Sequence, residues 1–262
     1  MIGCLTGKRV LVGGGSQGIG RACAVELARL GAEVAIVARD EAALKNVVAD
    51  LDGGGGRIHR YVVADFGNPP ALQTKIAEHV QRFGTLEILV NNTGGPPHGA
   101  LLDAGPEQFL KALSDHIICA QLLVQTLLPS MKAKGYGRII NIISTSVIAP
   151  IKGLGVSNTT RGAMANWGRT LAGELAPLGI TVNNVLPGYT ATGRLRTLFE
   201  AKARKAGRTV EEIERQVIDA IPMGRLADPS EIGAVVAFLA SPAASYVTGV
   251  NLPVDGGRTA VQ

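Results

Sequence analysis

Short apolar runs alternate with longer amphipathic stretches along most of the chain. Runs rich in Val and Ile, typical of strands, occupy residues 9–13, 32–39, 59–65, 86–92, 137–144 and 180–187. Helical spacing is found in residues 20–31, 40–51, the segment after Pro69-Pro70, a long region ending near Lys134, and residues 156–176. The strands are apolar throughout, which indicates that both faces of the sheet are covered. The pattern therefore predicts an α/β fold with a doubly wound parallel sheet.

The sequence shows no internal repeat and no linker, so we expect residues 1–262 to form a single domain. Residues 193–220 interrupt the alternation with a helical, hairpin-like insertion. The basic residues of this insertion include Arg194, Arg196, Lys202, Arg204, Lys205 and Arg208. Two interpretations are open. The basic residues form either a solvated helix surface or part of a mobile lid that meets an anionic substrate.

Composition excludes several classes of protein. Aromatic residues make up only 4% of the chain and the net charge is +5, which does not suggest nucleic-acid binding but is compatible with anionic small molecules. No apolar run reaches the roughly 18 residues of a membrane span. The N-terminal residues lack the apolar core of a secretory signal. Three scattered cysteines suit neither a disulfide framework nor a zinc site, so we expect a cytoplasmic protein without a metal.

A glycine-rich segment, VGGGSQGIGRA at 12–22, joins the first predicted strand to the first predicted helix. Gly13, Gly15 and Gly18 match the pattern GxGxxG in the strand–turn–helix context that this motif requires. Glycines allow the backbone to approach a pyrophosphate, and the start of the helix provides free N–H groups and positive potential. The segment therefore predicts a dinucleotide site.

The same glycine-rich segment also contains GxSxG around Ser16, the nucleophile elbow of α/β-hydrolases. That mechanism needs an acidic residue and then a late histidine after the serine. All four histidines lie in the first half of the chain, at positions 59, 79, 98 and 116. A hydrolase is therefore disfavoured.

Read from Gly14, the turn Gly14-xxx-Gly18-Ile19-Gly20 resembles the TGxxxGIG motif of the short-chain dehydrogenase/reductase family, with Gly13 in place of threonine. Other segments resemble the family's NNAG, NISS and PGxxxT motifs and its last strand, in order residues 91–94, 141–144, 187–192 and 246–257. The match is best to the 3-oxoacyl-carrier-protein reductase-like branch. The resemblance implies a three-layered Rossmann fold, an NAD(P) cofactor and a homodimer or homotetramer.

An acidic residue at the end of the second strand would bind the ribose 2′-hydroxyl of NAD and repel a 2′-phosphate. In the family's register this position is Ala38, followed by Arg39, a good phosphate partner, while Asp40 is expected to cap the next helix. NADP(H) is therefore favoured over NAD(H). The resemblance implies further cofactor contacts at Ser16, Gln17, Asp65, Phe66, Asn92, Thr93, Gly94, Pro187, Gly188, Thr190 and Thr192.

The catalytic tetrad of the family, Asn, Ser, Tyr and Lys, is kept at only one position. Ser144 matches the serine, whereas His116, Ser157 and Arg161 occupy the positions of the asparagine, tyrosine and lysine. Arg161 can retain the ribose contact, but with an ordinary pKa above about 12 it cannot relay protons. Ser157 is the severe change, because general acid catalysis contributes roughly 10²- to 10⁴-fold.

Three side chains are candidates for a substitute acid: Tyr189, which the resemblance places beside the nicotinamide, and His116 and His98, which we expect to titrate near neutrality. Arg161 could alternatively bind a substrate carboxylate. The sequence thus predicts an NADP(H)-dependent oxidoreductase with an atypical proton route, acting on a small carbonyl or alcohol, with anionic and acyl-carrier-linked substrates among the candidates. The alternative is a weakly active or inactive homologue that binds the cofactor as a sensor or partner subunit.

Overall fold

The structure is a computed structural model that describes residues 4–261. Met1–Gly3 and Gln262, the ends of the predicted domain, lie outside the described residues. A seven-stranded parallel sheet has the order β3-β2-β1-β4-β5-β6-β7. The strands are β1 (Arg9–Gly13), β2 (Glu33–Ala38), β3 (Arg60–Val63), β4 (Ile88–Asn91), β5 (Gly137–Ile142), β6 (Ile180–Pro187) and β7 (Asn251–Val254). The predicted doubly wound sheet is confirmed.

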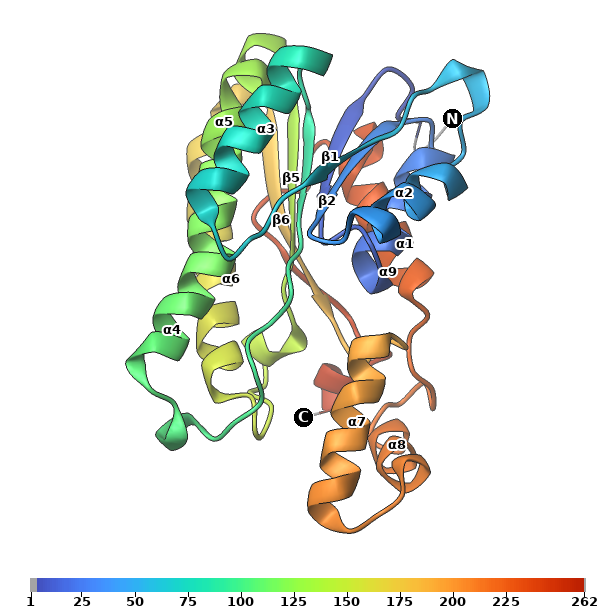
Figure 1. The fold of residues 1–262 in the computed structure, drawn as a ribbon, viewed down its shortest axis with the longest axis vertical. Coiled ribbons are helices and arrows are strands. Elements are labelled where there is room, and N and C mark those ends of the chain that lie inside the picture. Colours follow the sequence, from blue (N-terminus) through green and yellow to red (C-terminus); the bar gives the residue numbers. More distant parts are fainter. Residues whose placement is uncertain (1–3, 262) are drawn as a thin grey trace.

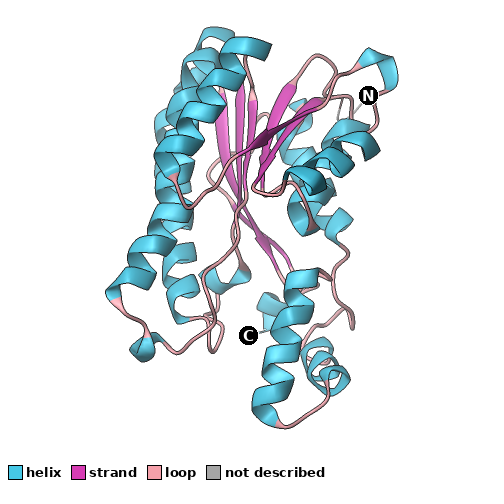
Figure 2. Cartoon of the chain, in the orientation of Figure 1, coloured by secondary structure: helices cyan, strands magenta, loops and turns pink. Residues whose placement is uncertain are grey.

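Helices cover both faces of the sheet and complete three layers (Figures 1 and 2). One face carries α1 (Gly18–Arg29), α2 (Glu41–Asp50) and α9 (Pro229–Ala240), seen on the right in Figure 1. The other face carries α3 (Pro69–Phe83), α5 (Cys119–Lys134) and α6 (Gly155–Leu175), with α4 (Pro106–Leu113) beyond them. The central strands are buried along their whole length, which explains their unbroken apolar sequences.

Local sequence explains several helix ends. Asp40 accepts a hydrogen bond from the backbone N–H of Ala43 at 3.0 Å, which confirms its predicted role as the cap of α2. The first helix runs from Gly18 to Arg29 rather than over 20–31, because Gly18 already enters the helix from the tight turn and Leu30 ends it. The stretch before Lys134 is not one regular helix, since a π-helical turn at Ser114–Ile118 separates α4 from α5.

Four asparagines connect the strands on one side of the sheet's centre. Asn91, Asn141, Asn184 and Asn251 are in register on β4, β5, β6 and β7. Each side-chain amide donates to the next side-chain oxygen, at 2.8, 2.9 and 2.8 Å. Gly168 of α6 faces this row so closely that a Cβ there would lie 2.5 Å from Oδ1 of Asn184. The missing side chain therefore lets α6 approach the sheet.

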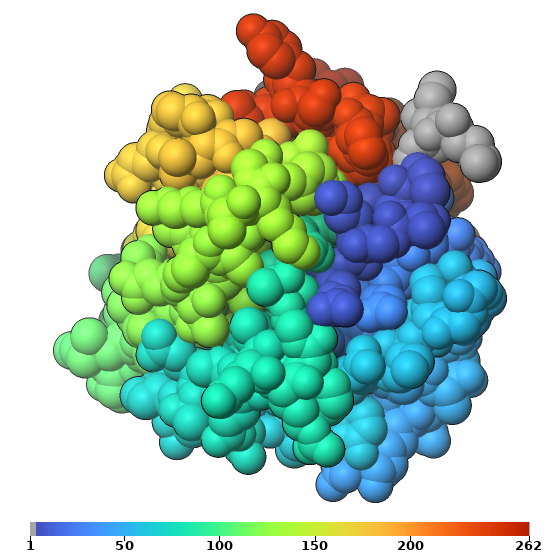
Figure 3. Space-filling model, turned by 90° about the horizontal axis from the view of Figure 1, so that it is seen from above, coloured from blue at the N-terminus to red at the C-terminus, as the bar shows by residue number. Residues whose placement is uncertain are grey.

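The insertion forms two helices, α7 (Gly193–Ala206) and α8 (Val210–Ile218), beyond the carboxyl ends of the strands (Figure 1). They share a small apolar core of Phe199, Ala203 and Ile213. Figure 3 shows the opposite end of the molecule, where segments far apart in the sequence, coloured blue, cyan, green and red, lie side by side. Within residues 4–261, no helix is both long and apolar enough to cross a membrane.

Candidate active site

The glycine-rich turn after β1 is shaped by close backbone contacts. Gly14 and Gly18 have φ angles of +58° and +55°, a conformation that favours glycine. A Cβ on Gly20 would collide with the backbone oxygen of Gly14, and one on Gly13 would lie 2.7 Å from the backbone oxygen of Asn92. The turn therefore has no side chains on the side of its backbone that leads into α1.

The start of α1 is open to a ligand. Gln17 stands at the N-cap, and within the described chain its side chain makes no capping hydrogen bond and the first turn of α1 has no acidic residue. The N–H groups of this turn and the positive end of the helix dipole are therefore available to an anion. Ser16 lies in the same turn and is half-buried, whereas Ile19 packs against the core.

Two distant segments flank the turn. Asn92, directly after β4, donates from Nδ2 to the backbone oxygen of Gly13 at 3.0 Å. Thr192 approaches from the other side, where its Cγ2 would lie 3.3 Å from a Cβ on Gly18. Thr93 and Gly94 continue the β4 segment at the same edge of the sheet. The structure thus brings together three segments that the sequence assigned to the cofactor.

Arg39 and Asp65 lie at the carboxyl ends of β2 and β3. Arg39 is exposed and has no ion pair within residues 4–261, so its guanidinium is available to a ligand. Asp65 accepts a hydrogen bond from the backbone N–H of Gly67 at 2.8 Å, which fixes the turn after β3. That turn carries Phe66, whose ring would lie 3.0 Å from a Cβ on Gly13.

The segment after β6 has a fixed backbone. Pro187 ends β6, and Gly188 donates its N–H to the backbone oxygen of Val254 at 2.9 Å. Thr190 is buried and donates from Oγ1 to the backbone oxygen of Gly188 at 3.2 Å. Thr192 caps α7 by accepting from the N–H of Leu195.

Helix α6 brings Ser157 and Arg161 to the carboxyl end of β5. They lie one turn apart, and Arg161 donates from Nη1 to the backbone oxygen of Ile142, the last residue of β5, at 3.0 Å. Ser144 follows two residues later, and its Oγ accepts a hydrogen bond from the N–H of Ser146 at 3.1 Å. Burial, with a smaller effect of Arg194, lowers the pKa of Arg161 to about 10. The expected value above 12 is therefore too high, although the group stays charged at neutral pH.

His116 lies in the π-helical turn and is only 5% exposed. Among the described residues, its Nε2 has no hydrogen-bond partner. Burial, followed by the charges of Arg161 and Arg194, lowers the pKa of His116 to about 2. The expectation that His116 titrates near neutrality is wrong, because desolvation of the buried ring disfavours its charged form and the charges of Arg161 and Arg194 add to this effect. His98 is exposed, and partial desolvation with Arg194 and Lys202 lowers its pKa as well.

Arg194 crosses from the first turn of α7 to the segment after β4. A Cβ on Gly95 would lie 2.5 Å from its Nη2, and the same nitrogen lies 3.5 Å from the backbone oxygen of Pro96. Arg194 remains open to solvent, although surrounding protein atoms lower its pKa. Arg196 of the same helix is different, since it is 81% exposed and pairs with Glu200 at 3.4 Å. Only part of the basic surface of α7 therefore faces the site.

Tyr189 lies between the insertion and the C-terminal segment. Its ring centroid is 6.5 Å from that of Phe199, and the guanidinium carbon of Arg258 lies 5.2 Å from its ring. Tyr189 also lines a pocket with residues of the segments 221–231 and 254–256. Arg258 has two buried nitrogens, Nε and Nη1, that are unpaired within the part of the chain that the structure describes. Arg258 could not be identified from the sequence, because none of the motifs includes it.

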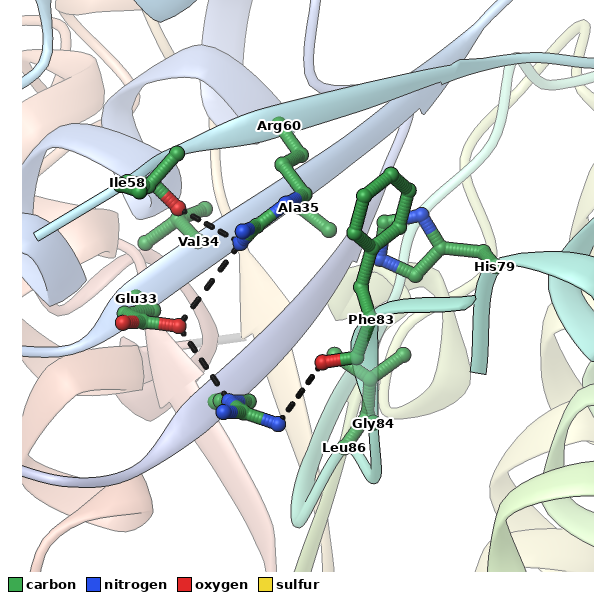
Figure 4. Close-up of a pocket in the computed structure, with 10 residues that line it drawn as sticks. Glu33, Val34, Ala35, Ile58, Arg60, His79, Phe83, Gly84 and Leu86 are labelled. Carbon is green, nitrogen blue, oxygen red and sulfur yellow. Dashed lines mark hydrogen bonds and ion pairs between the residues drawn. The ribbon is translucent and has the colours of Figure 1, made fainter. Parts of the chain in front are cut away.

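A second, polar pocket lies at the opposite end of the sheet (Figure 4). It is lined by Arg9, Glu33 and Arg60, the first residues of β1, β2 and β3, together with His79 and Phe83. Glu33 pairs with Arg9 at 3.2 Å and with Arg60 at 3.8 Å. In open parallel sheets ligands bind beyond the carboxyl ends of the strands. This pocket is therefore a structural ion cluster rather than the candidate site.

The comparisons with known proteins agree with the geometry of the carboxyl edge. Residues 14–259 match the family described as enoyl-(acyl carrier protein) reductase. A tropinone reductase homolog of Arabidopsis thaliana is 34% identical over 256 residues, covering 97% of this chain and 93% of the relative. The chain belongs to the short-chain dehydrogenase/reductase family.

Two further matches cover nearly the whole of both chains. The oxidoreductase UcpA of Escherichia coli is 35% identical over 260 residues, covering 98% of this chain and 97% of the relative. The crystal structure of L-sorbose reductase from Gluconobacter frateurii, complexed with NADPH and L-sorbose, superimposes with a TM-score of 0.92 and 30% identity. It covers 99% of each chain. The predicted family resemblance is confirmed, and with it an oxidoreductase fold.

Proposed function

We propose that the protein is an NADP(H)-dependent oxidoreductase that interconverts a small carbonyl compound and the corresponding alcohol. The observation that supports this most directly is the bare glycine turn with the uncapped start of α1, which fits a cofactor diphosphate. Arg39, without an acidic partner among residues 4–261, suits a ribose 2′-phosphate. The solved L-sorbose reductase is complexed with NADPH, which favours the same cofactor.

The remaining cofactor contacts follow from the segments around the turn. Asp65 and Phe66 would contact the adenine, Asn92, Thr93 and Gly94 the adenosine ribose, and Pro187, Gly188, Thr190 and Thr192 the nicotinamide side of the cofactor. Arg161 lies between β5 and the nicotinamide side and can donate to the second ribose. When bound, the cofactor supplies or accepts a hydride. In reduction the carbonyl carbon accepts that hydride and the carbonyl oxygen accepts one proton, which gives the alcohol.

Neither His116 nor Ser157 is an effective proton donor in this site. His116 is neutral at physiological pH, and Ser157 is a weakly acidic, buried hydroxyl. We place Ser144 as the donor that orients the carbonyl and Arg161 as the charge that stabilises the developing alkoxide, with the proton delivered from water. Tyr189 is engaged with Phe199 and Arg258 and is the remaining side-chain candidate.

A second function is favoured by the loss of the tyrosine. With Ser157 in its place, the protein can bind the cofactor yet turn substrates over very slowly, as a sensor or partner subunit would. We also propose assembly as a homodimer or homotetramer, because the large apolar side chains of Leu102, Leu110 and Ile118 are exposed. The cytoplasm suits the free thiols of Cys4, Cys23 and Cys119.

Two measurements test the proposal. NADPH and NADH are titrated into the purified protein by cofactor fluorescence, and we expect tighter binding of NADPH. Carbonyl panels are then assayed with wild type and with Ser157→Tyr/Arg161→Lys, which restores an acid and its lysine. Turnover by wild type supports the oxidoreductase, whereas turnover by the double variant alone supports the second function. If neither cofactor binds, both proposals are wrong.

A further inference from the structure

Three groups that would repel one another in the charged state lie at the carboxyl edge of the sheet. Arg161 reaches it from α6, Arg194 from α7, and His116 from the turn between α4 and α5. Arg194 lies against Gly95 and Pro96 after β4, and Arg161 donates to the backbone oxygen of Ile142 at the end of the neighbouring strand β5. Arg194 lowers the pKa of both Arg161 and His116, and Arg161 lowers that of His116.

This cluster lacks a counter-ion. Within residues 4–261, neither arginine forms a salt bridge, and no acidic group affects the pKa of Arg161, Arg194 or His116. Arg196, also on α7, differs, since it pairs with Glu200. Two desolvated cations without an acidic partner in the described chain indicate that a ligand supplies the negative charge.

The deepest member of the cluster points to a ligand independently of charge. His116 is 95% buried and its Nε2 lacks a partner among the described residues, a costly state for a polar nitrogen. The ring is uncharged, so it can take part in one hydrogen bond without adding a third positive charge. An incoming group that accepts hydrogen bonds would satisfy His116 and both guanidinium groups together.

We propose that the substrate is an oxo acid or the corresponding hydroxy acid, and that Arg194 binds its carboxylate, with the positive charge of Arg161 and the ring of His116 beside it. This inference rests on the proposed function and specifies its substrate class. Arg161 lies one helical turn from Ser157 and at the end of the strand that leads to Ser144. A carboxylate held there lies close to the reacting carbonyl, so α- and β-oxo acids fit better than acids with a long spacer. A planar guanidinium binds a carboxylate through two parallel hydrogen bonds.

The test compares acids with their uncharged esters. Pyruvate, acetoacetate and phenylpyruvate, each paired with its methyl ester, are titrated by calorimetry into the complex with NADP⁺, which cannot reduce them. We expect at least one acid to bind about tenfold or more tightly than its ester, because a charge-assisted pair is lost in the ester. Turnover with NADPH should show the same preference in kcat/KM.

Arg194→Gln is the decisive variant, and Arg196→Gln on the same helix is its matched control. The first should abolish the preference for the acid while the NADPH affinity stays unchanged, and the second should alter neither. A preference for the acid that survives Arg194→Gln overturns the inference, as does equal binding of acids and esters by wild type. A weaker NADPH affinity in Arg194→Gln with an unchanged acid preference assigns Arg194 to the cofactor instead. Failure of wild type to bind NADPH or NADH would contradict the proposed function itself.

Discussion

Arg161 donates a hydrogen bond from Nη1 to the backbone oxygen of Ile142 at 3.0 Å, which ties α6 to the end of β5. This contact holds a positive charge near Ser144, two residues beyond Ile142. A lysine can keep the charge at this position but cannot reproduce the planar, multiple-donor geometry of a guanidinium. Substitutions of Arg161 can therefore separate the effect of the positive charge from the effect of the guanidinium geometry.

The first prediction concerns this charge. Arg161→Met should lower kcat by about 100-fold or more, because it removes the charge that stabilises the alkoxide. Arg161→Lys should retain more activity than Arg161→Met. Wild-type reduction should also slow as the pH rises through about 10, where Arg161 loses its proton. Steady-state rates from pH 6 to pH 11 measure this, and equal losses in the two variants would contradict the assigned role.

The second prediction concerns cofactor binding by the glycine-rich turn after β1. Gly20→Ala should abolish cofactor binding, because its Cβ would collide with the backbone oxygen of Gly14 and displace the turn. Gly173→Ala in α6 is the matched control, since no atom lies within 4 Å of a Cβ there. The control should bind NADPH normally and gain about 1 kcal/mol of stability from the higher helix propensity of alanine. Fluorescence titration and urea unfolding check both, and normal NADPH affinity in Gly20→Ala would place the cofactor elsewhere.

Cofactor choice is the subject of the third prediction. Arg39→Asp should weaken NADPH binding by about tenfold or more and bring NADH to equal or better affinity, because a carboxylate repels the 2′-phosphate and accepts from the 2′-hydroxyl. Arg21→Asp, on the outside of α1 and paired with Asp50 in the native protein, serves as a control for net charge. The ratio of the two dissociation constants is the readout. An unchanged ratio in Arg39→Asp would remove Arg39 from the site.

A fourth prediction tests the packing of α6 under the asparagine row. Gly168→Ala should cost about 1–3 kcal/mol of stability, because the new methyl group meets Asn184 and Asn141 at 2.5 and 2.8 Å. Shortening the neighbour in Gly168→Ala/Asn184→Ala makes room for that methyl group. The two changes should therefore cost less together than the sum of the single changes, by about 0.5–3 kcal/mol. If the changes in unfolding free energy, measured with urea, are additive, the new methyl group at position 168 does not clash with the side chain of Asn184.

Much of the fold could be predicted from the chain because the information is local. Strands with unbroken apolar sequences, the cap at Asp40 and the glycine turn each depend on neighbouring residues. The state of His116 could not be predicted, since it is set by burial and by Arg161 and Arg194, which lie far along the sequence. Tertiary contacts decide the charge of a buried group, and local sequence patterns do not reveal these contacts.

His116 provides the last prediction, for stability against pH. Its pKa falls from 6.5 to about 2 on folding, so between these values the unfolded state binds more protons. Stability is therefore lost as the pH falls below 6.5, by up to about 1.4 kcal/mol for each pH unit. Glu231, whose pKa is lowered from 4.5 to about 2, affects the stability only at lower pH, as the pH falls below about 4.5. Between pH 7.5 and 5, His116→Gln should lose about 2 kcal/mol less than wild type in urea unfolding, and equal losses would show that the buried ring is protonated in the native protein.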